Sequence, residues 1–167
     1  TWAPWFVLLL IGFPPEMIFL QSGLNLLYQF WIHTEAIRRM PAWFEYLFNT
    51  PSHHRVHHAS NPRYVDRNYA GIFMVWDRMF GTFVAERDDD PPKYGLIHNI
   101  DTFNPIKIAF HEWAAMFRDV GRSRSLREIG GYIFGPPGWR PDGSGPTAAN
   151  VRAAWMAAPQ GGTPAAS

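Results

Sequence analysis

The chain has 167 residues, and its 15 Lys+Arg against 14 Asp+Glu leave a formal charge of +1, with no basic field for nucleic acid. The absence of cysteine excludes disulfide frameworks, cysteine-type zinc sites, iron–sulfur clusters and thiol nucleophiles. Aromatic residues reach 16% and charged residues only 17%, which is typical of a protein that meets a membrane interface. Because Thr1 opens directly onto an apolar run, we expect a C-terminal fragment without a signal peptide.

The first forty residues predict two membrane helices. Residues 1–13 are almost entirely apolar and stop at Pro14-Pro15, so they resemble the end of a span that began upstream. A second helix is expected at about residues 16–40. The pair Arg38-Arg39 beside this span favours the cytoplasmic side. The alternative is a buried helix of a soluble core.

Four of the seven histidines fall within six residues. We expect a helix here, with Ser52 as a candidate N-cap. On that helix His54 shares a face with His57 and His58. His53 forms a further i, i+4 pair with His57 on the adjacent stripe. Convergent neutral imidazoles bind Zn, Fe, Cu and Ni, so this cluster is a candidate metal site; the alternative is a solvated or pH-sensing patch.

The other three histidines stand singly. His33 lies at the polar end of the second apolar helix, where a ligand and a structural role are equally expected. His98 in a predicted loop and His111 in a predicted helix favour structural roles. Neither a Glu-x-x-His motif nor H-E-x-x-H accompanies the cluster, so a carboxylate-bridged bundle site and a zinc protease both lack their residues.

Downstream of the cluster we expect helices, one acidic loop and a tail. Residues 68–83 predict a helix or partly buried segment that ends at Gly81, and residues 86–90 predict a solvated acidic loop. Residues 135–167 are rich in Gly, Pro and Ala and predict an extended, largely disordered tail, with a short helix near its middle as the alternative. Asn104-Pro105 opens an amphipathic helix, suited to core packing or to lying on a bilayer, whose apolar stripe is Ile106, Phe110, Trp113 and Phe117.

Four motifs together resemble the fatty acid hydroxylase superfamily, the sterol desaturase-like, membrane-bound, non-haem di-iron oxygenases: QFWIHTE at 29–35, HHRVHHASNPR at 53–63, DRNYAG at 66–71 and WDRMFGTF at 76–83. Three later motifs resemble bacterial members of its alkylglycerol monooxygenase-like subgroup: YGLIH at 94–98, TFNP at 102–105 and FGPPGWRP at 134–141.

The resemblance and the predicted elements imply an all-α, integral-membrane helical bundle with a cytosolic histidine-rich cap. Residues 1–134 would form the C-terminal part of the hydroxylase domain, with membrane helices at about 1–13 and 16–40 and the metal-binding cap at about 41–120. Residues 135–167 would form the extended tail.

The resemblance also implies a ligand set. His33 matches the lone histidine ligand of the family, and His54, His57 and His58 match its final H-x2-H-H cluster. The family's other two clusters, H-x3-H and a first H-x2-H-H, have no counterpart in this sequence. We therefore expect half of a di-iron site here and no activity from this chain alone. His53 is a possible additional ligand.

Three polar residues are candidates to receive the free N–H of a ligating histidine: Asp66, Asn68 and Asp77. For Asp77 a local pair with Arg78 or another Arg is the favoured alternative. The implied activity is hydroxylation of a C–H bond in a fatty acyl, sterol-like or alkylglycerol lipid with O₂, an electron-transfer partner and no nucleic acid. Desaturation at the same site, a non-catalytic membrane metal-binding protein and an interaction protein with an incidental histidine patch are the alternatives.

Overall fold

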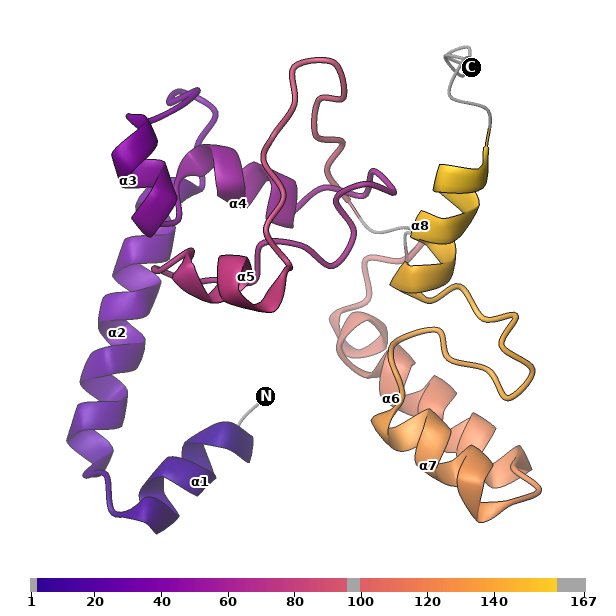
Figure 1. Ribbon diagram of the computed structural model, residues 1–167. Helices are drawn as coiled ribbons and strands as arrows, with labels where there is room; N and C mark the ends of the chain where they lie inside the picture. Colours follow the sequence, from indigo (N-terminus) through magenta and orange to yellow (C-terminus); the bar gives the residue numbers. More distant parts are fainter. Residues whose placement is uncertain (1–2, 96–99, 159–167) are drawn as a thin grey trace. The chain divides into compact units, whose positions relative to one another are not determined.

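The computed structural model describes residues 3–95 and 100–158 (Figure 1), and within these residues every regular element is a helix. The helices are α1 (Ala3–Ile11), α2 (Pro15–Ile32), α3 (Ala42–Leu47), α4 (Pro51–His57), α5 (Val75–Phe80), α6 (Pro105–Arg122), α7 (Leu126–Phe134) and α8 (Ala148–Ala157). The predicted all-α class is confirmed. The chain divides into two compact units, residues 1–59 with 66–94, and residues 60–65 with 95–167.

In the first unit, α1 and α2 meet at a tight turn and diverge away from it (Figure 1). Gly12 takes the left-handed φ of 102° there, and Pro15 occupies the first turn of α2, where its missing N–H costs nothing. The expectation that this helix continues to about residue 40 is wrong, because α2 ends at Ile32. Within the described residues, no helix is both long enough and apolar enough to cross a membrane.

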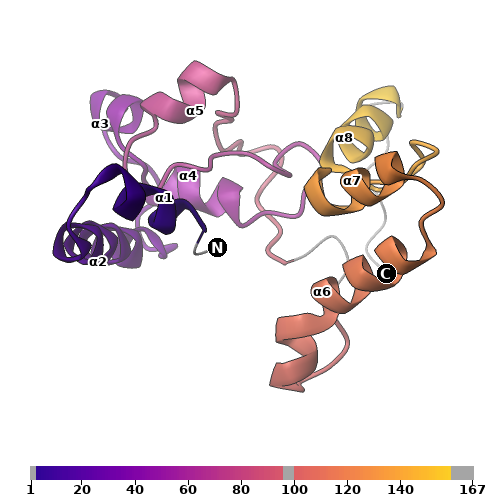
Figure 2. The same cartoon turned by 90° about the horizontal axis from the view of Figure 1, so that it is seen from below.

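The buried core of this unit surrounds α4. Ile32 from α2, Val56 from α4 and Met74 before α5 are each at most 1% exposed. Figure 2 shows α3 beside α5, where an isolated bridge pairs Phe48 with Phe73 and Met74 donates its N–H to the Leu47 carbonyl. The histidine helix therefore packs on a small apolar core.

The ends of the short helices follow local chemistry. The expected N-cap at Ser52 is wrong: α4 begins at Pro51 after Thr50, and Ser52 is buried in the first turn. The predicted ending at Gly81 is confirmed, because Gly81 caps α5 with a left-handed φ of 69°. Of the broader segment 68–83, only α5 is helical.

The second unit opens with α6, which Asn104 caps as expected by accepting from the N–H groups of Ile106 and Lys107. The apolar stripe of α6 does not pack within the described part of this unit, since each of its side chains is more than half exposed: Ile106, Phe110, Trp113 and Phe117. A bilayer position for α6 stays a prediction.

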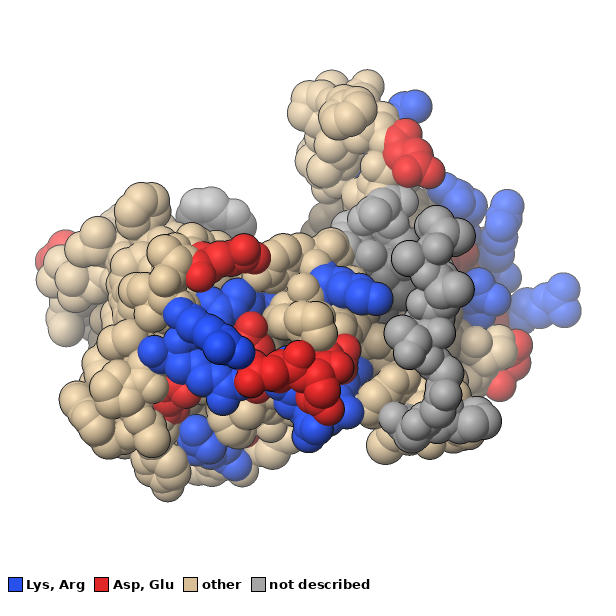
Figure 3. All heavy atoms as spheres, turned by 90° about the horizontal axis from the view of Figure 1, so that it is seen from above, with Lys and Arg blue, Asp and Glu red and all other residues tan. Residues whose placement is uncertain are grey.

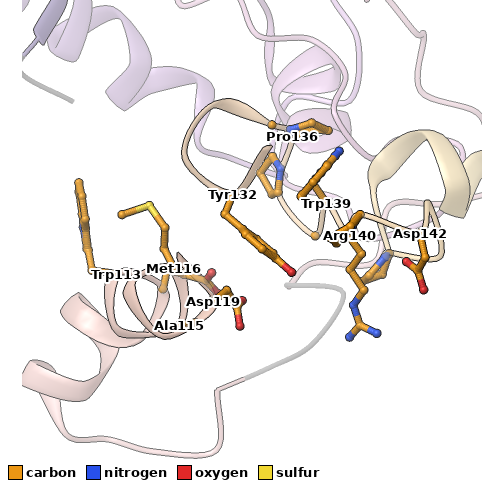
Figure 4. Close-up of a pocket in the computed structure, with 15 residues that line it drawn as sticks. Trp113, Ala115, Met116, Asp119, Tyr132, Pro136, Trp139, Arg140 and Asp142 are labelled. Atoms are coloured by element: carbon orange, nitrogen blue, oxygen red, sulfur yellow. The ribbon is translucent and has the colours of Figure 1, made fainter. Parts of the chain in front are cut away.

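A folded loop follows α7. The Trp139 ring lies against Gly131, where an added Cβ would collide with the ring, and contacts Tyr132 edge-on at 5.2 Å. Figure 4 shows these aromatic side chains beside a cavity of about 970 Å³ between α6, α7 and the loop. This Gly-Pro-rich segment therefore packs on the glycine surface of α7.

Within the predicted tail, the structure contains the alternative short helix, α8. Thr147 caps it, Arg152 donates to the Val65 carbonyl at 2.7 Å, and Arg63 lies over the Trp155 ring at 4.9 Å. These contacts supply the tertiary packing that a short helix needs. Residues 159–167 lie outside the described part of the chain.

Candidate metal centre

Three histidine rings converge at the C-terminal ends of α2 and α4. His33 is the C-cap of α2, while His54 lies in α4 and His58 is the C-cap of α4. The Nε2 atom of His33 is 2.8 Å from that of His54 and 3.2 Å from that of His58. The Nε2 atoms of His54 and His58 are 3.0 Å apart. The i, i+4 pair predicted on one helix face is therefore joined by a histidine 21 residues earlier.

Hydrogen bonding determines which nitrogen of His33 directs its lone pair into the cluster. Its Nδ1 lies 2.6 Å from the Gln29 carbonyl oxygen, which can only accept. In the neutral ring Nδ1 therefore carries the proton, and Nε2 presents its lone pair to the other two rings. This is the arrangement that orients a ligating imidazole.

The surroundings keep the rings of His54 and His58 neutral. Burial, followed by the neighbouring rings of His33, His58 and His57, lowers the pKa of His54 to about 3. Burial, followed by His57 and His33, also lowers the pKa of His58. Both rings are therefore uncharged at neutral pH, which is the form that binds metal ions.

The donor set of His33, His54 and His58 fits one transition-metal ion. Their Nε2 atoms lie 2.8–3.2 Å apart, and two nitrogens bound to one metal at ~2.0–2.1 Å can be at most about 4.2 Å apart. Three imidazoles suit Fe, Zn, Cu or Ni, so the chemistry alone leaves the metal open.

His57, the fourth expected ligand, lies beside this set. Its ring is stacked on His54 at a centroid distance of 5.5 Å, and its Nδ1 lies 3.4 Å from the Arg67 carbonyl oxygen. Its nitrogens do not belong to the converging group. As for His33, a carbonyl oxygen next to Nδ1 favours the tautomer with the proton on Nδ1. The Nε2 of His57 then has a lone pair that could bind a separate ion.

The remaining histidines lie elsewhere. His53 is 2% exposed, contacts the Phe83 ring edge-on at 5.3 Å, and takes no part in the converging group. His111 lies in the second unit, where its Nδ1 is 2.9 Å from the Ile108 carbonyl oxygen. His98, expected to be structural, lies outside the described residues.

Two of the three polar candidates, Asp77 and Asn68, bond to the backbone. Asp77, 2% exposed, accepts from the N–H groups of Tyr69 and Ala70 and from the Thr82 hydroxyl. The expected local ion pair of Asp77 with Arg78 is wrong, because Arg78 donates instead to the Tyr46 carbonyl.

Asn68 is fully buried with a positive φ of 53°, and its amide donates to the carbonyls of His53 and Val84. Asp66 is exposed and also has a positive φ, of 52°. Asn68 therefore connects α4 to residues 82–84, and Asp77 ties the loop at residues 69–70 to α5.

One important pair was missed from the sequence. Arg55, within the histidine motif, forms a buried bidentate ion pair with Glu86, the first residue of the run expected to be a solvated acidic loop. A signal existed: an arginine between paired histidines on a helix whose other face is buried needs a carboxylate partner.

Comparison with known proteins agrees with this site. A model of the fatty acid hydroxylase family matches residues 1–82. The chain is 44% identical over 128 residues to the alkylglycerol monooxygenase of Homo sapiens and 46% identical over 132 residues to that of Xenopus tropicalis. It is 40% identical over 138 residues to the alkylglycerol monooxygenase of Caenorhabditis elegans.

These alignments cover 77% of this chain but only 27–28% of each relative, so the chain spans just over a quarter of their length. No solved structure matches the chain. The residues matched by the family model include the motifs at 29–35, 53–63 and 66–71, and the relatives agree with the resemblance to alkylglycerol monooxygenases. Residues 1–82 therefore resemble the fatty acid hydroxylase family, and the chain is similar to alkylglycerol monooxygenases.

Proposed function

We propose that the full-length protein is a membrane-bound, di-iron lipid monooxygenase and that this chain supplies part of its iron centre. The observation that carries the proposal is the convergence of three imidazole nitrogens, 2.8–3.2 Å apart, in a chain similar to alkylglycerol monooxygenases. An alkylglycerol is accordingly the first substrate to test, before fatty acyl and sterol-like lipids.

In this proposal His33, His54 and His58 hold one iron. His57 binds the second together with histidines from the part of the protein outside this chain. When bound, the iron pair supplies the O₂ chemistry that attacks an unactivated C–H bond. Hydroxylation puts one oxygen atom into that bond and releases the other as water, so two electrons and two protons must come from an electron-transfer partner.

The chain's own residues orient and insulate the ligands. The Gln29 carbonyl directs Nε2 of His33 into the cluster, and burial keeps His54 neutral and therefore able to bind metal. A membrane location is supported by the apolar side chains that α1 and α2 expose, among them Phe6, Leu10, Phe19, Leu27 and Phe30. With Arg38 and Arg39 directly beyond α2, we place the centre on the cytoplasmic side.

The test is metal content and product formation by the full-length protein. We expect two iron atoms per chain, and incorporation of one atom of ¹⁸O₂ into an alkylglycerol in the presence of a reductant. His54→Ala and His58→Ala should each abolish both, whereas His111→Ala, in the second unit, should change neither by more than about twofold.

Three results separate the alternatives. Tightly bound zinc, without iron and without turnover, indicates a non-catalytic metal-binding protein. If the protein binds no metal, the proposed centre itself is wrong. A product with a new double bond and no incorporated oxygen indicates desaturation at the same site.

A further inference from the structure

Arg55 lies in the histidine helix, directly after His54. Its side chain is 10% exposed and reaches the segment that follows His33. Nη1 donates to the carbonyls of Thr34 at 3.2 Å and Ile37 at 2.9 Å, and Nη2 donates to the carbonyl of Arg38 at 2.6 Å. One side chain thus satisfies three backbone acceptors in five residues.

The same guanidinium is fixed from the other side by Glu86. Nε donates to Oε1 at 2.9 Å and Nη2 to Oε2 at 2.6 Å. Burial raises the pKa of Glu86, but hydrogen bonds from Arg55 and Ser52 outweigh it and hold the pKa below its ordinary value. A guanidinium has five N–H donors, and the five contacts use all of them.

Residues 33–38 have no helical structure of their own. His33 ends α2 with φ −80° and ψ 64°, and a short contact from the Ala36 N–H to the Thr34 hydroxyl is the local bond within the segment. The path by which the chain leaves His33 is therefore set by the carbonyls that Arg55 binds. Because Arg55 sits on the helix that carries His54 and His58, it links the two elements that must bring their ligands together.

We infer that Arg55 is the positioning residue of the metal centre: it holds His33 against His54 and His58 without touching the metal. The inference rests on the proposed function, since it assigns a role within that centre. Lysine cannot replace it, because an ammonium is a single point with three donors and cannot reach a carboxylate and three carbonyls together.

The exposed face of the first unit offers a matched control. Arg38 and Arg39 both pair with Asp88 but are 79% and 47% exposed. Figure 3 shows basic and acidic side chains gathered together on one face of the molecule. Within the described residues, the side chain of Arg38 hydrogen-bonds only to Asp88, at 3.0 Å. Arg38→Lys therefore changes an arginine in the same segment without removing a buried contact.

The experiment measures Co²⁺ affinity of the full-length protein, without turnover, by competition with a chelator under anaerobic conditions. Arg55→Lys should weaken binding about 10–100-fold, the range typical for residues that orient metal ligands. Arg38→Lys should change it by less than about threefold. The decisive comparison is a double variant: if Arg55 acts through His33, Arg55→Lys should add less than about threefold loss in a His33→Ala background.

Each outcome decides something. If the losses from Arg55→Lys and His33→Ala multiply, Arg55 acts through general stability and the inference is overturned. If His33→Ala weakens Co²⁺ binding and Arg55→Lys does not, the inference fails while the proposed centre stands. If His33→Ala has no effect, the centre is misassigned and both fail. Should Arg55→Lys not fold, Glu86→Gln must give a smaller loss that also disappears with His33→Ala.

Discussion

The junction at Asn68 gives the sharpest stability prediction. Asn68 is fully buried, its amide donates to the carbonyls of His53 at 3.1 Å and Val84 at 2.8 Å, and its Oδ1 accepts from the Val84 N–H at 2.9 Å. Its φ of 53° is a left-handed conformation that asparagine tolerates better than alanine. Removing this side chain should therefore disconnect α4 from residues 82–84 and strain the backbone.

The magnitude follows from these contacts. Three hydrogen bonds at about 1 kcal/mol each, plus about 1 kcal/mol for alanine in the left-handed region, give a loss of about 4 kcal/mol for Asn68→Ala. Asn68→Gly loses the same three bonds but not the strain, so about 3 kcal/mol is expected. The difference of about 1 kcal/mol between these variants isolates the backbone contribution.

Asp66 is the matched control, because it has nearly the same φ, 52°, but is exposed. Asp66→Gly should stay within about 0.5 kcal/mol of the parent, and Asp66→Ala should cost about 1 kcal/mol. The assay is denaturant unfolding of the detergent-purified protein, with hydrogen exchange at Val84 as the local readout. If Asn68→Ala costs no more than Asp66→Ala and the Val84 amide stays protected, the buried junction is not what holds these segments.

Three further changes test other contacts. Gly131→Ala places a Cβ against the Trp139 ring and should lower the melting temperature of the second unit at a cost of about 1–3 kcal/mol, whereas Gly130→Ala, with open space, should be neutral or stabilising. Asp77→Asn turns one acceptor into a donor facing a backbone N–H, and should cost about 2–3 kcal/mol and speed exchange of the two loop amides it binds. Because the pKa of Glu86 is below its ordinary 4.5 in the folded protein, its ion pair stabilises above pH 4.5 and is lost as pH falls through the folded pKa. The urea midpoint should accordingly fall more steeply below pH 4.5 in the parent than in Glu86→Gln.

Signals that act within a few residues predicted their elements well. Asn104 before Pro105 marks the start of α6 because its side chain satisfies N–H groups two and three residues later. Gly81 marks the end of α5 because a left-handed residue is needed there. The facing pair His54 and His58 follows from helical spacing alone.

Features set by tertiary contacts were not predictable in the same way. The polar residues after Ile32 are compatible with a continuing helix, and α2 stops because the backbone beyond it is bound by a side chain 17–21 residues later. The helix α8 persists in a Gly-Pro-rich segment because Arg152 and Trp155 have partners in residues 60–65. Composition carries no information on such partners.

The acidic run at residues 86–90 shows how one pattern can divide into two environments. Asp88 is 69% exposed and pairs with surface arginines, as expected for a solvated loop, but the Glu86 side chain is only 14% exposed. A buried carboxylate is stable only when its charge and lone pairs are matched, and Arg55 supplies both through two parallel hydrogen bonds. The arginine of this pair directly follows His54 in α4, so the carboxylate that was expected to lie in solvent instead binds the side chain that holds the backbone after His33. In the proposed centre, the position of the His33 nitrogen therefore depends on an arginine and a glutamate as well as on the histidines.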